Sequence, residues 1–249
     1  MFGLWFVAIP EGTLVRLIEG SLGGRDLSVE VVGLKKGLFY NFTSQEVVLK
    51  RADTKLLSVD HLAARIHPLS LFLMRPSLSF RGEMGGGLIE GRIDRRKGGN
   101  QAWVRFAESK IGEVPLLATL GFSGQGVLSG ELALVNGSGD LRFSIEGAQL
   151  QGRSLYGAMI PWDLFERAQG VLTIEGDRIH IRSFSLEGRG LYARVRGEIR
   201  RQALDLKVEV MPDPSLAADK SPRLSLIAAF KVSPGYYVIP IKSDLPLHP

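Results

Sequence analysis

Apolar and polar residues alternate along most of the chain, and glycines interrupt the alternation at intervals. From Leu191 to Ile199 the odd positions are small or apolar, whereas the even positions are polar or amphipathic. From Leu204 to Val210 apolar side chains alternate with acidic and basic ones. A period of two is typical of a β-strand with one buried face and one solvated face. The pattern therefore predicts an all-β fold, based on a long, strongly twisted antiparallel sheet.

Glycine indicates where this sheet turns and bends. The chain has 30 glycines among 249 residues, well above the usual share of roughly 7%. In a β background such glycines mark turns and bulges. Because flat sheets of this length are unusual, we expect the sheet to curl into a half-pipe or an open sandwich. Asn136-Gly137 predicts a hairpin between strands at 126–134 and 140–150, since both residues tolerate positive φ.

The same pattern places the remaining elements. Short helices are predicted at 10–20, where apolar residues recur at helical spacing, and at 111–120, with one helical turn at 161–167. Residues 58–67 fit both a strand and a helix. The other predicted strands are 27–34, 38–42, 46–51, 78–82, 88–94, 102–107, four within 171–211, 224–232 and 236–241, with turns at 35–37 and a loop at 212–222.

No linker divides the chain, so we expect a single β-rich domain over residues 10–242 and a loose tail at 243–249. Residues 1–9 (MFGLWFVAI) form an apolar run. The run is shorter than the roughly 20 residues that span a bilayer, and it lacks the basic start of a signal peptide. Two interpretations stay open: a buried apolar segment, or the remnant of an N-terminal membrane anchor that begins upstream.

The composition is that of a globular protein, with 45% hydrophobic and 23% charged residues. The chain is mildly basic, with a net charge of +5. Arginines gather at 92–96 and along 189–201, but acidic residues are interleaved with them and no aromatic stacking motif accompanies them. These clusters are typical of solvated strand faces. We expect no nucleic-acid partner, and an anionic membrane surface suits the basic clusters better.

Candidate chemistry is sparse. The absence of cysteine excludes disulfides, zinc–cysteine sites and thiol chemistry. Around Ser123, a nucleophile elbow would require glycine where Gln125 stands. None of the four histidines has a metal-ligand spacing beside a carboxylate. We therefore expect no enzymatic activity, no catalytic residue, no metal and no cofactor.

Several segments, in their order along the chain, resemble a known family. They are an apolar start that ends in Pro10, a Gly-rich stretch at 85–91, GVLSGELAL at 126–134, GDLRFSIEGAQL at 139–150, and the alternating run from Leu172 to Pro212. They resemble the type II secretion system protein N family and, more distantly, the AsmA-like proteins of the Gram-negative envelope. The resemblance covers nearly the whole chain and rests on glycines and alternating apolar positions.

This resemblance implies a non-enzymatic component of the type II secretion machinery. Such a protein would lie on the periplasmic side of the Gram-negative inner membrane, with residues 1–9 as the end of its anchor. Its partners would be other secretion components and the inner membrane. The alternative is an AsmA-like module for lipid binding or transfer, whose concave apolar sheet face receives phospholipid acyl chains. The candidate residues of that face are Leu191, Val195, Ile199, Leu204, Leu206 and Val208.

Overall fold

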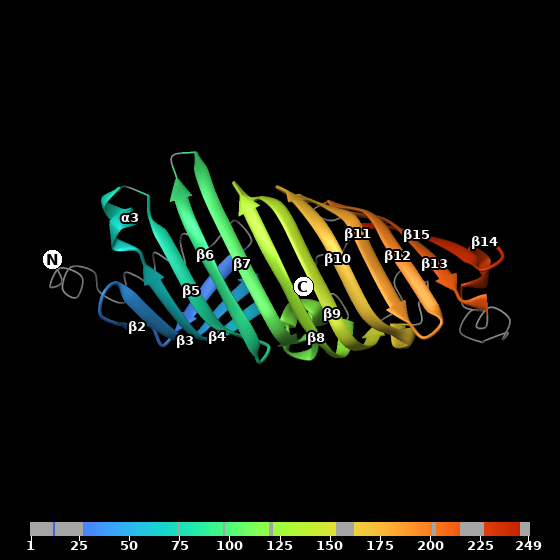
Figure 1. Ribbon diagram of the computed structural model, residues 1–249, viewed down its shortest axis with the longest axis horizontal. Helices are drawn as coiled ribbons and strands as arrows, with labels where there is room; N and C mark the ends of the chain where they lie inside the picture. The colour runs from blue at the N-terminus through green and yellow to red at the C-terminus, as the bar shows by residue number, and fades with distance from the viewer. Residues whose placement is uncertain are drawn as a thin grey trace. The chain divides into compact units, whose positions relative to one another are not determined.

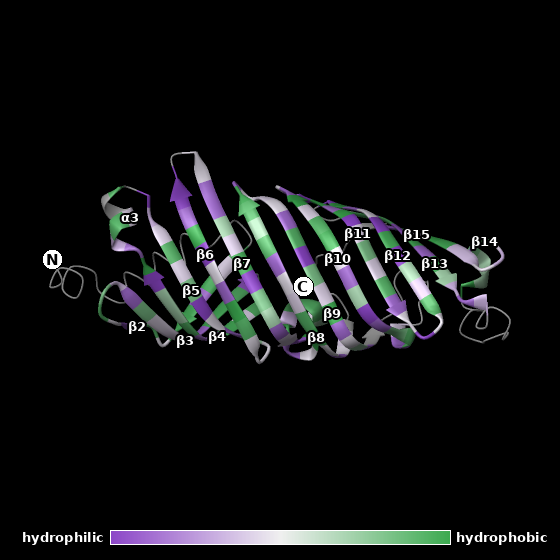
Figure 2. Cartoon of the chain, in the orientation of Figure 1, coloured by the Kyte–Doolittle hydropathy of each residue, from purple (hydrophilic) through white to green (hydrophobic). Residues whose placement is uncertain are grey.

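The computed structural model confirms an all-β fold. Fifteen strands belong to one antiparallel sheet, and the helices of the described residues are few and short (Figure 1). The strand order begins at β1 and ends at β14, so within the described ranges the sheet is open. Bands of hydrophobic and hydrophilic colour along the strands show the alternation that predicts them (Figure 2). The structure describes residues 12, 27–73, 75–96, 98–119, 122–152, 162–200, 203–214 and 227–244.

The chain divides into two compact units. Unit 1 comprises Met1–Leu120, Ala133–Asn136 and Pro249, and unit 2 comprises Gly121–Leu132 and Gly137–His248. The sequence pattern contains no boundary at this place, because the strand alternation continues through 122–135. The two units are described separately below.

In unit 1, strands that follow one another pair in antiparallel fashion from β3 to β7, and β1 and β2 both pair with β3. Short helices follow two of the strands. The elements are β1 Leu27–Val32, β2 Lys35–Lys36, β3 Asn41–Arg51, β4 Thr54–Ile66, α3 Pro68–Phe72, β5 Ser77–Met84, β6 Gly87–Arg96, β7 Gly99–Lys110, η1 Ile111–Glu113 and α4 Pro115–Thr119.

The core of unit 1 contains two clusters of buried side chains. One is formed by Leu34, Phe42 and Ala64, and the other by Val59, Met84 and Ile89. Phe80 of β5 packs against both clusters. A single aromatic side chain thus connects the packing of β3 and β4 with that of β6.

Two predictions in unit 1 are corrected by the structure. The strand expected at 38–42 begins only at Asn41, because Phe39 and Tyr40 have φ of 56° and 61°, a left-handed conformation incompatible with a strand. The turn expected at 35–37 instead contains the short strand β2. Of residues 58–67, which fit both a helix and a strand, 58–66 form most of β4 and His67 follows it. The helix predicted at 10–20 lies, apart from Gly12, outside the described residues.

The predicted hairpin at Asn136-Gly137 is confirmed. It joins β8 (Phe122–Val135) to β9 (Ser138–Gly152), with φ of 54° at Asn136 and 78° at Gly137. The Asn136 side chain has a second role, because its Oδ1 accepts a hydrogen bond from the Asn100 backbone N–H at 2.9 Å. The residue that permits the turn therefore also holds the start of β7.

In unit 2, strands from β9 to β13 pair in sequence order, and β15 pairs with both β13 and β14. The four strands predicted within 171–211 are confirmed. The strand predicted at 224–232 is wrong at 227–230, because Phe230 N–H donates to the Ile227 carbonyl at 3.0 Å and closes a helical turn, whereas residues 231–232 do belong to a strand, β14. The elements are η2 Trp162–Leu164, β10 Phe165–Glu175, β11 Arg178–Gly188, β12 Leu191–Arg200, β13 Ala203–Pro212, η3 Ala228–Phe230, β14 Lys231–Ser233 and β15 Tyr236–Asp244.

Candidate functional site

The strand register of unit 2 gathers apolar side chains on one face of its sheet. Residues directly opposite one another in antiparallel strands point to the same side, and so do residues two apart along a strand. Val195 lies opposite Val208, and Ile199 lies opposite Leu204. The register thus places all the predicted apolar residues on one face of β12 and β13: Leu191, Val195, Ile199, Leu204, Leu206 and Val208.

The apolar face extends well beyond these two strands. Phe184 of β11 lies opposite Val195, and Gly170 of β10 lies opposite Phe184. On the other side, Ile239 of β15 lies opposite Val208. Phe143 of β9 lies opposite Gly170, and its ring centroid is 5.7 Å from that of Phe184. Six strands, from β9 to β13 together with β15, therefore share this face.

A bulge in β11 keeps the face continuous. The register of β11 with β12 shifts between Ile181 and Phe184. Apolar side chains stand at odd positions before the shift and at even positions after it. One extra residue in a strand reverses the side to which the following residues point. Ile179 and Ile181 therefore share the apolar face with Phe184 and Leu186, although their numbers differ in parity.

The burial of this face changes along the strands. Leu191, Val195 and Val208 are 3%, 6% and 3% exposed. Toward the β10–β11 and β12–β13 turns, by contrast, the side chains of the same face are only half-buried. We call this region the open apolar end, and it consists of Leu172, Ile174, Ile179, Ile181, Ile199, Leu204 and Leu206.

The six predicted residues are thus on one face but in two environments. Leu191, Val195 and Val208 lie within the core of unit 2, whereas Ile199, Leu204 and Leu206 lie in the open apolar end. Sequence reasoning missed the contributions of β10 and β11 to this end. The alternation of VLTIEGDRIHI at 171–181 contains the signal, but only strand pairing shows that these residues lie beside Ile199.

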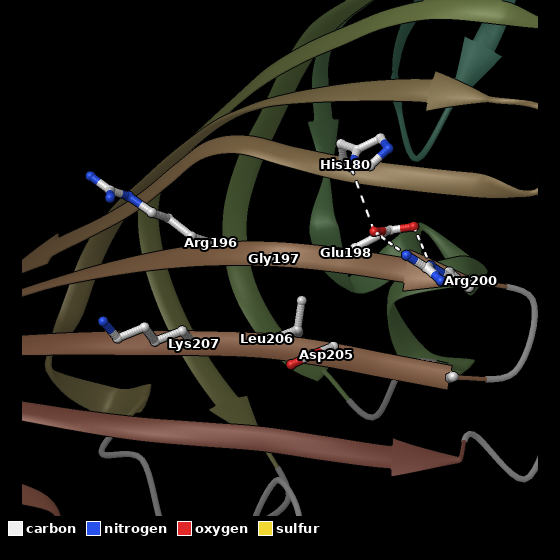
Figure 3. A pocket seen from close by; sticks show the side chains of 9 residues that line it. His180, Arg196, Gly197, Glu198, Arg200, Asp205, Leu206 and Lys207 are labelled. Atoms are coloured by element: carbon white, nitrogen blue, oxygen red, sulfur yellow. Dashed lines mark hydrogen bonds and ion pairs between the residues drawn. The ribbon is translucent and has the colours of Figure 1, made fainter.

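The opposite face of β11, β12 and β13 is charged and forms a shallow hollow of about 670 Å³ (Figure 3). His180, Glu198 and Arg200 lie close together there, with Arg196 and Lys207 toward the other side. Arg200 Nη2 donates to Glu198 Oε2 at 3.0 Å, and His180 Nδ1 lies 3.9 Å from the same oxygen. The hydrogen bond from Arg200 is the main reason that the pKa of Glu198 is lowered. The oppositely charged side chains of Glu198 and Arg200 in this hollow thus pair with each other.

The other residues considered for chemistry have ordinary surroundings. Ser123 lies within β8 rather than at a strand-to-helix turn. His61 Nδ1 lies 3.6 Å from Glu83 Oε2, and His67 Nε2 lies 2.8 Å from Ser79 Oγ. His248 is outside the described residues. Among the residues that the structure describes, no three His, Asp or Glu side chains are placed to hold a metal ion.

Comparison of the chain with protein-family models, with curated proteins and with solved structures found no match. In the described part of the chain, no helix combines the length and the apolar character needed to cross a membrane. The apolar run at 1–9 lies outside that part. A function must therefore be argued from the surfaces of the two units.

Proposed function

We propose that this protein is a non-enzymatic lipid-binding module of the Gram-negative envelope, in which unit 2 binds phospholipid acyl chains at its open apolar end. One observation carries the proposal. The apolar face of unit 2 is buried in one half and only half-buried in the other. In the half-buried part, aliphatic side chains lie on four neighbouring strands.

The chemistry of the open apolar end suits hydrocarbon. Its side chains are all Leu or Ile, so it offers contacts to methylene groups and no hydrogen bonds. Four adjacent strands extend over three strand spacings, roughly 14 Å. Burying ten methylenes there would contribute about 8 kcal/mol before the entropy of ordering the chain is subtracted.

Positive charge borders the same end of the sheet. Arg178 lies directly opposite Arg200, where β11 and β12 reach the turns beside the open apolar end. Opposed like charges on neighbouring strands are unfavourable by themselves. Both arginines lie on the charged face of the sheet, and Arg200 there donates to Glu198, so the proposed contact with the lipid is made by its acyl chain, on the other face.

The test measures phospholipid uptake by the purified full chain. The variant Ile199→Asn/Leu204→Asn places amides in the open apolar end, and we expect it to lower uptake of a labelled phospholipid at least about tenfold, since each amide adds a desolvation penalty. Val232→Asn is the matched control, because Val232 is 64% exposed and lies in β14, outside this face. Native mass spectrometry of the unmodified protein should show bound lipid.

Unchanged uptake by the double variant would contradict the assignment of the site. A protein that purifies without lipid and takes up none would contradict lipid binding altogether. Thermal unfolding of each variant separates loss of the site from loss of the fold.

As a second function, we propose that the protein is a component of the type II secretion machinery at the periplasmic side of the inner membrane. The support is the order of sequence segments that resembles the type II secretion system protein N family. Deleting the gene in a host with this machinery should leave exported substrates in the periplasm, and restoring it should return them to the medium. Normal secretion by the deletion strain would contradict this function and leave the lipid-binding proposal unaffected.

A further inference from the structure

Unit 1 exposes four large apolar side chains at one end of its sheet. Leu38 and Phe39 are 66% and 54% exposed, and Leu69 and Leu73 are 78% and 68% exposed. The first pair lies in the turn before β3, and the second lies in or directly after α3, which follows β4 (Figure 1). Because β3 and β4 are antiparallel neighbours, these segments meet at the same end of the sheet. The residues that adjoin the two segments are hydrogen-bonded there, since Ile66 N–H donates to the Tyr40 carbonyl at 3.0 Å.

Hydrogen bonds fix the conformation of both segments. In the turn, Gly37 N–H donates to the Asn41 carbonyl at 2.8 Å, and Asn41 N–H donates to the Leu38 carbonyl at 3.2 Å. Phe39 and Tyr40 both have left-handed backbones, which is rare for aromatic residues. Strained backbone of this kind persists only where surrounding structure determines it. The exposure of Leu38 and Phe39 is therefore built into the fold.

Ser70 holds the α3 segment in the same manner. Its hydroxyl donates to the His67 carbonyl and accepts from the Ser77 backbone N–H at 3.0 Å. Its carbonyl accepts from Arg75 N–H at 2.8 Å. This loop is thus anchored to the start of β5 while Leu69 and Leu73 point into solvent.

Basic residues surround these apolar side chains. No Asp or Glu occurs in 31–45 or in 61–82. The end of β6 lies beside the loop between α3 and β5, since Arg95 N–H donates to the Pro76 carbonyl at 2.9 Å. Figure 2 shows hydrophobic colour on α3 and hydrophilic colour at the end of β6. We call the region the basic apolar tip, and it consists of Leu38, Phe39, Leu69 and Leu73 with the exposed basic residues Lys35, Arg65, Arg75, Arg95 and Arg96.

Asp94 lies beside the tip, opposite Ser77. Its burial acts to raise its pKa, but hydrogen bonds from Ser77 and Arg92 and the charges of Arg92 and Arg96 outweigh burial and leave the pKa lowered. Arg92 Nε donates to Asp94 Oδ1 at 3.0 Å. Asp94 therefore offsets part of the positive charge at the end of β6, that of Arg92 and Arg96.

We propose that the basic apolar tip docks unit 1 on the anionic surface of a phospholipid bilayer. Exposed apolar side chains that enter the headgroup region, with Lys and Arg around them to meet lipid phosphates, are the combination that binds such surfaces. Exposed apolar patches of this kind mark interaction sites, and the basic side chains around this one favour an anionic membrane over an apolar protein surface. This contact is separate from the proposed lipid binding, because it lies in unit 1 and engages a bilayer rather than a single lipid.

The test places a local reporter in the full chain. Leu69→Trp should shift its fluorescence to shorter wavelength on vesicles of phosphatidylglycerol and phosphatidylethanolamine, and brominated lipids should quench it. Vesicles of phosphatidylcholine should have little effect, and added salt should weaken the response. Val232→Trp is the control, because Val232 is also highly exposed, at 64%, but lies in β14. The readout is local, so it is independent of any membrane contact by residues 1–9.

Charge is tested in the Leu69→Trp background. Arg65→Gln/Arg75→Gln should raise the lipid concentration for half-maximal response about thirtyfold, because each basic residue near an anionic surface contributes about a factor of five. The control Arg182→Gln/Lys231→Gln, on exposed residues of unit 2, should change it little. An unchanged spectrum on anionic vesicles, or an equal response to phosphatidylcholine, would overturn the proposal. Ile199→Asn/Leu204→Asn should not alter this response, which separates the two lipid proposals.

Discussion

Val195→Asp is expected to destabilise the protein by on the order of 4 kcal/mol, enough to unfold many domains at 37 °C. Val195 is 6% exposed and lies between Phe184 and Val208 in the strand register. An aspartate at this position would be a buried charge without a partner. Urea unfolding followed by circular dichroism measures the loss.

Arg196→Asp is the matched control, one residue away on the other face of β12. Arg196 is exposed and lies directly opposite Lys207, so an aspartate there replaces a repulsive cross-strand pair by an attractive one. We expect this variant to be as stable as the original or slightly more stable. Equal losses in the two variants would show that the two faces of β12 have been assigned wrongly.

Gly188→Ala is expected to cost about 3 kcal/mol or more, because it overpacks a site made of backbone. A Cβ at Gly188 would lie 1.7 Å from the Leu164 carbonyl oxygen and 2.7 Å from Phe165 Cα. No rotation of a side chain can relieve these contacts. The connection between η2 and β10 would have to move. It is held in place, because Arg189 N–H donates to the same carbonyl at 3.0 Å and Phe165 is fully buried. Thermal and urea unfolding measure the effect.

Gly176→Ala separates the steric effect from backbone strain. Gly176 has φ of 62° but nothing within 4 Å of an added Cβ, so only the left-handed conformation is penalised, by about 1 kcal/mol. We therefore expect Gly188→Ala to be clearly the more damaging variant. The reverse order would mean that η2 and β10 adjust to the added methyl group, and that this close approach does not hold unit 2 together.

Local sequence signals predicted most of the strands, and the exceptions have local causes. The hairpin at Asn136-Gly137 is predictable because two adjacent residues determine it. The strand expected at 38–42 is wrong because two aromatic residues, which normally favour strands, are held in left-handed backbone by bonds that close the turn before Asn41. Those bonds depend on how β3 begins, which a propensity does not encode.

The bulge in β11 shows a second kind of limit. The alternation of apolar residues changes parity between Ile181 and Phe184, and by itself such a change fits either an irregular strand or a strand end. Pairing with β12 on one side and β10 on the other shows that the strand continues. The apolar face therefore includes β11 residues that were not among the six predicted ones.

By itself the sequence determined that these strands have an apolar side and a polar side, because the pleat of a strand converts a period of two directly into two faces. It did not determine which part of the apolar side is covered. Val195 and Ile199 lie on the same face, four residues apart on β12, yet the first is buried in the core and the second lies in the open apolar end. In the same way, Leu34 and Leu38 are both leucines, and only Leu38 is exposed at the tip. Coverage depends on residues distant in sequence that pack over a surface, and the tertiary structure alone decides where they lie.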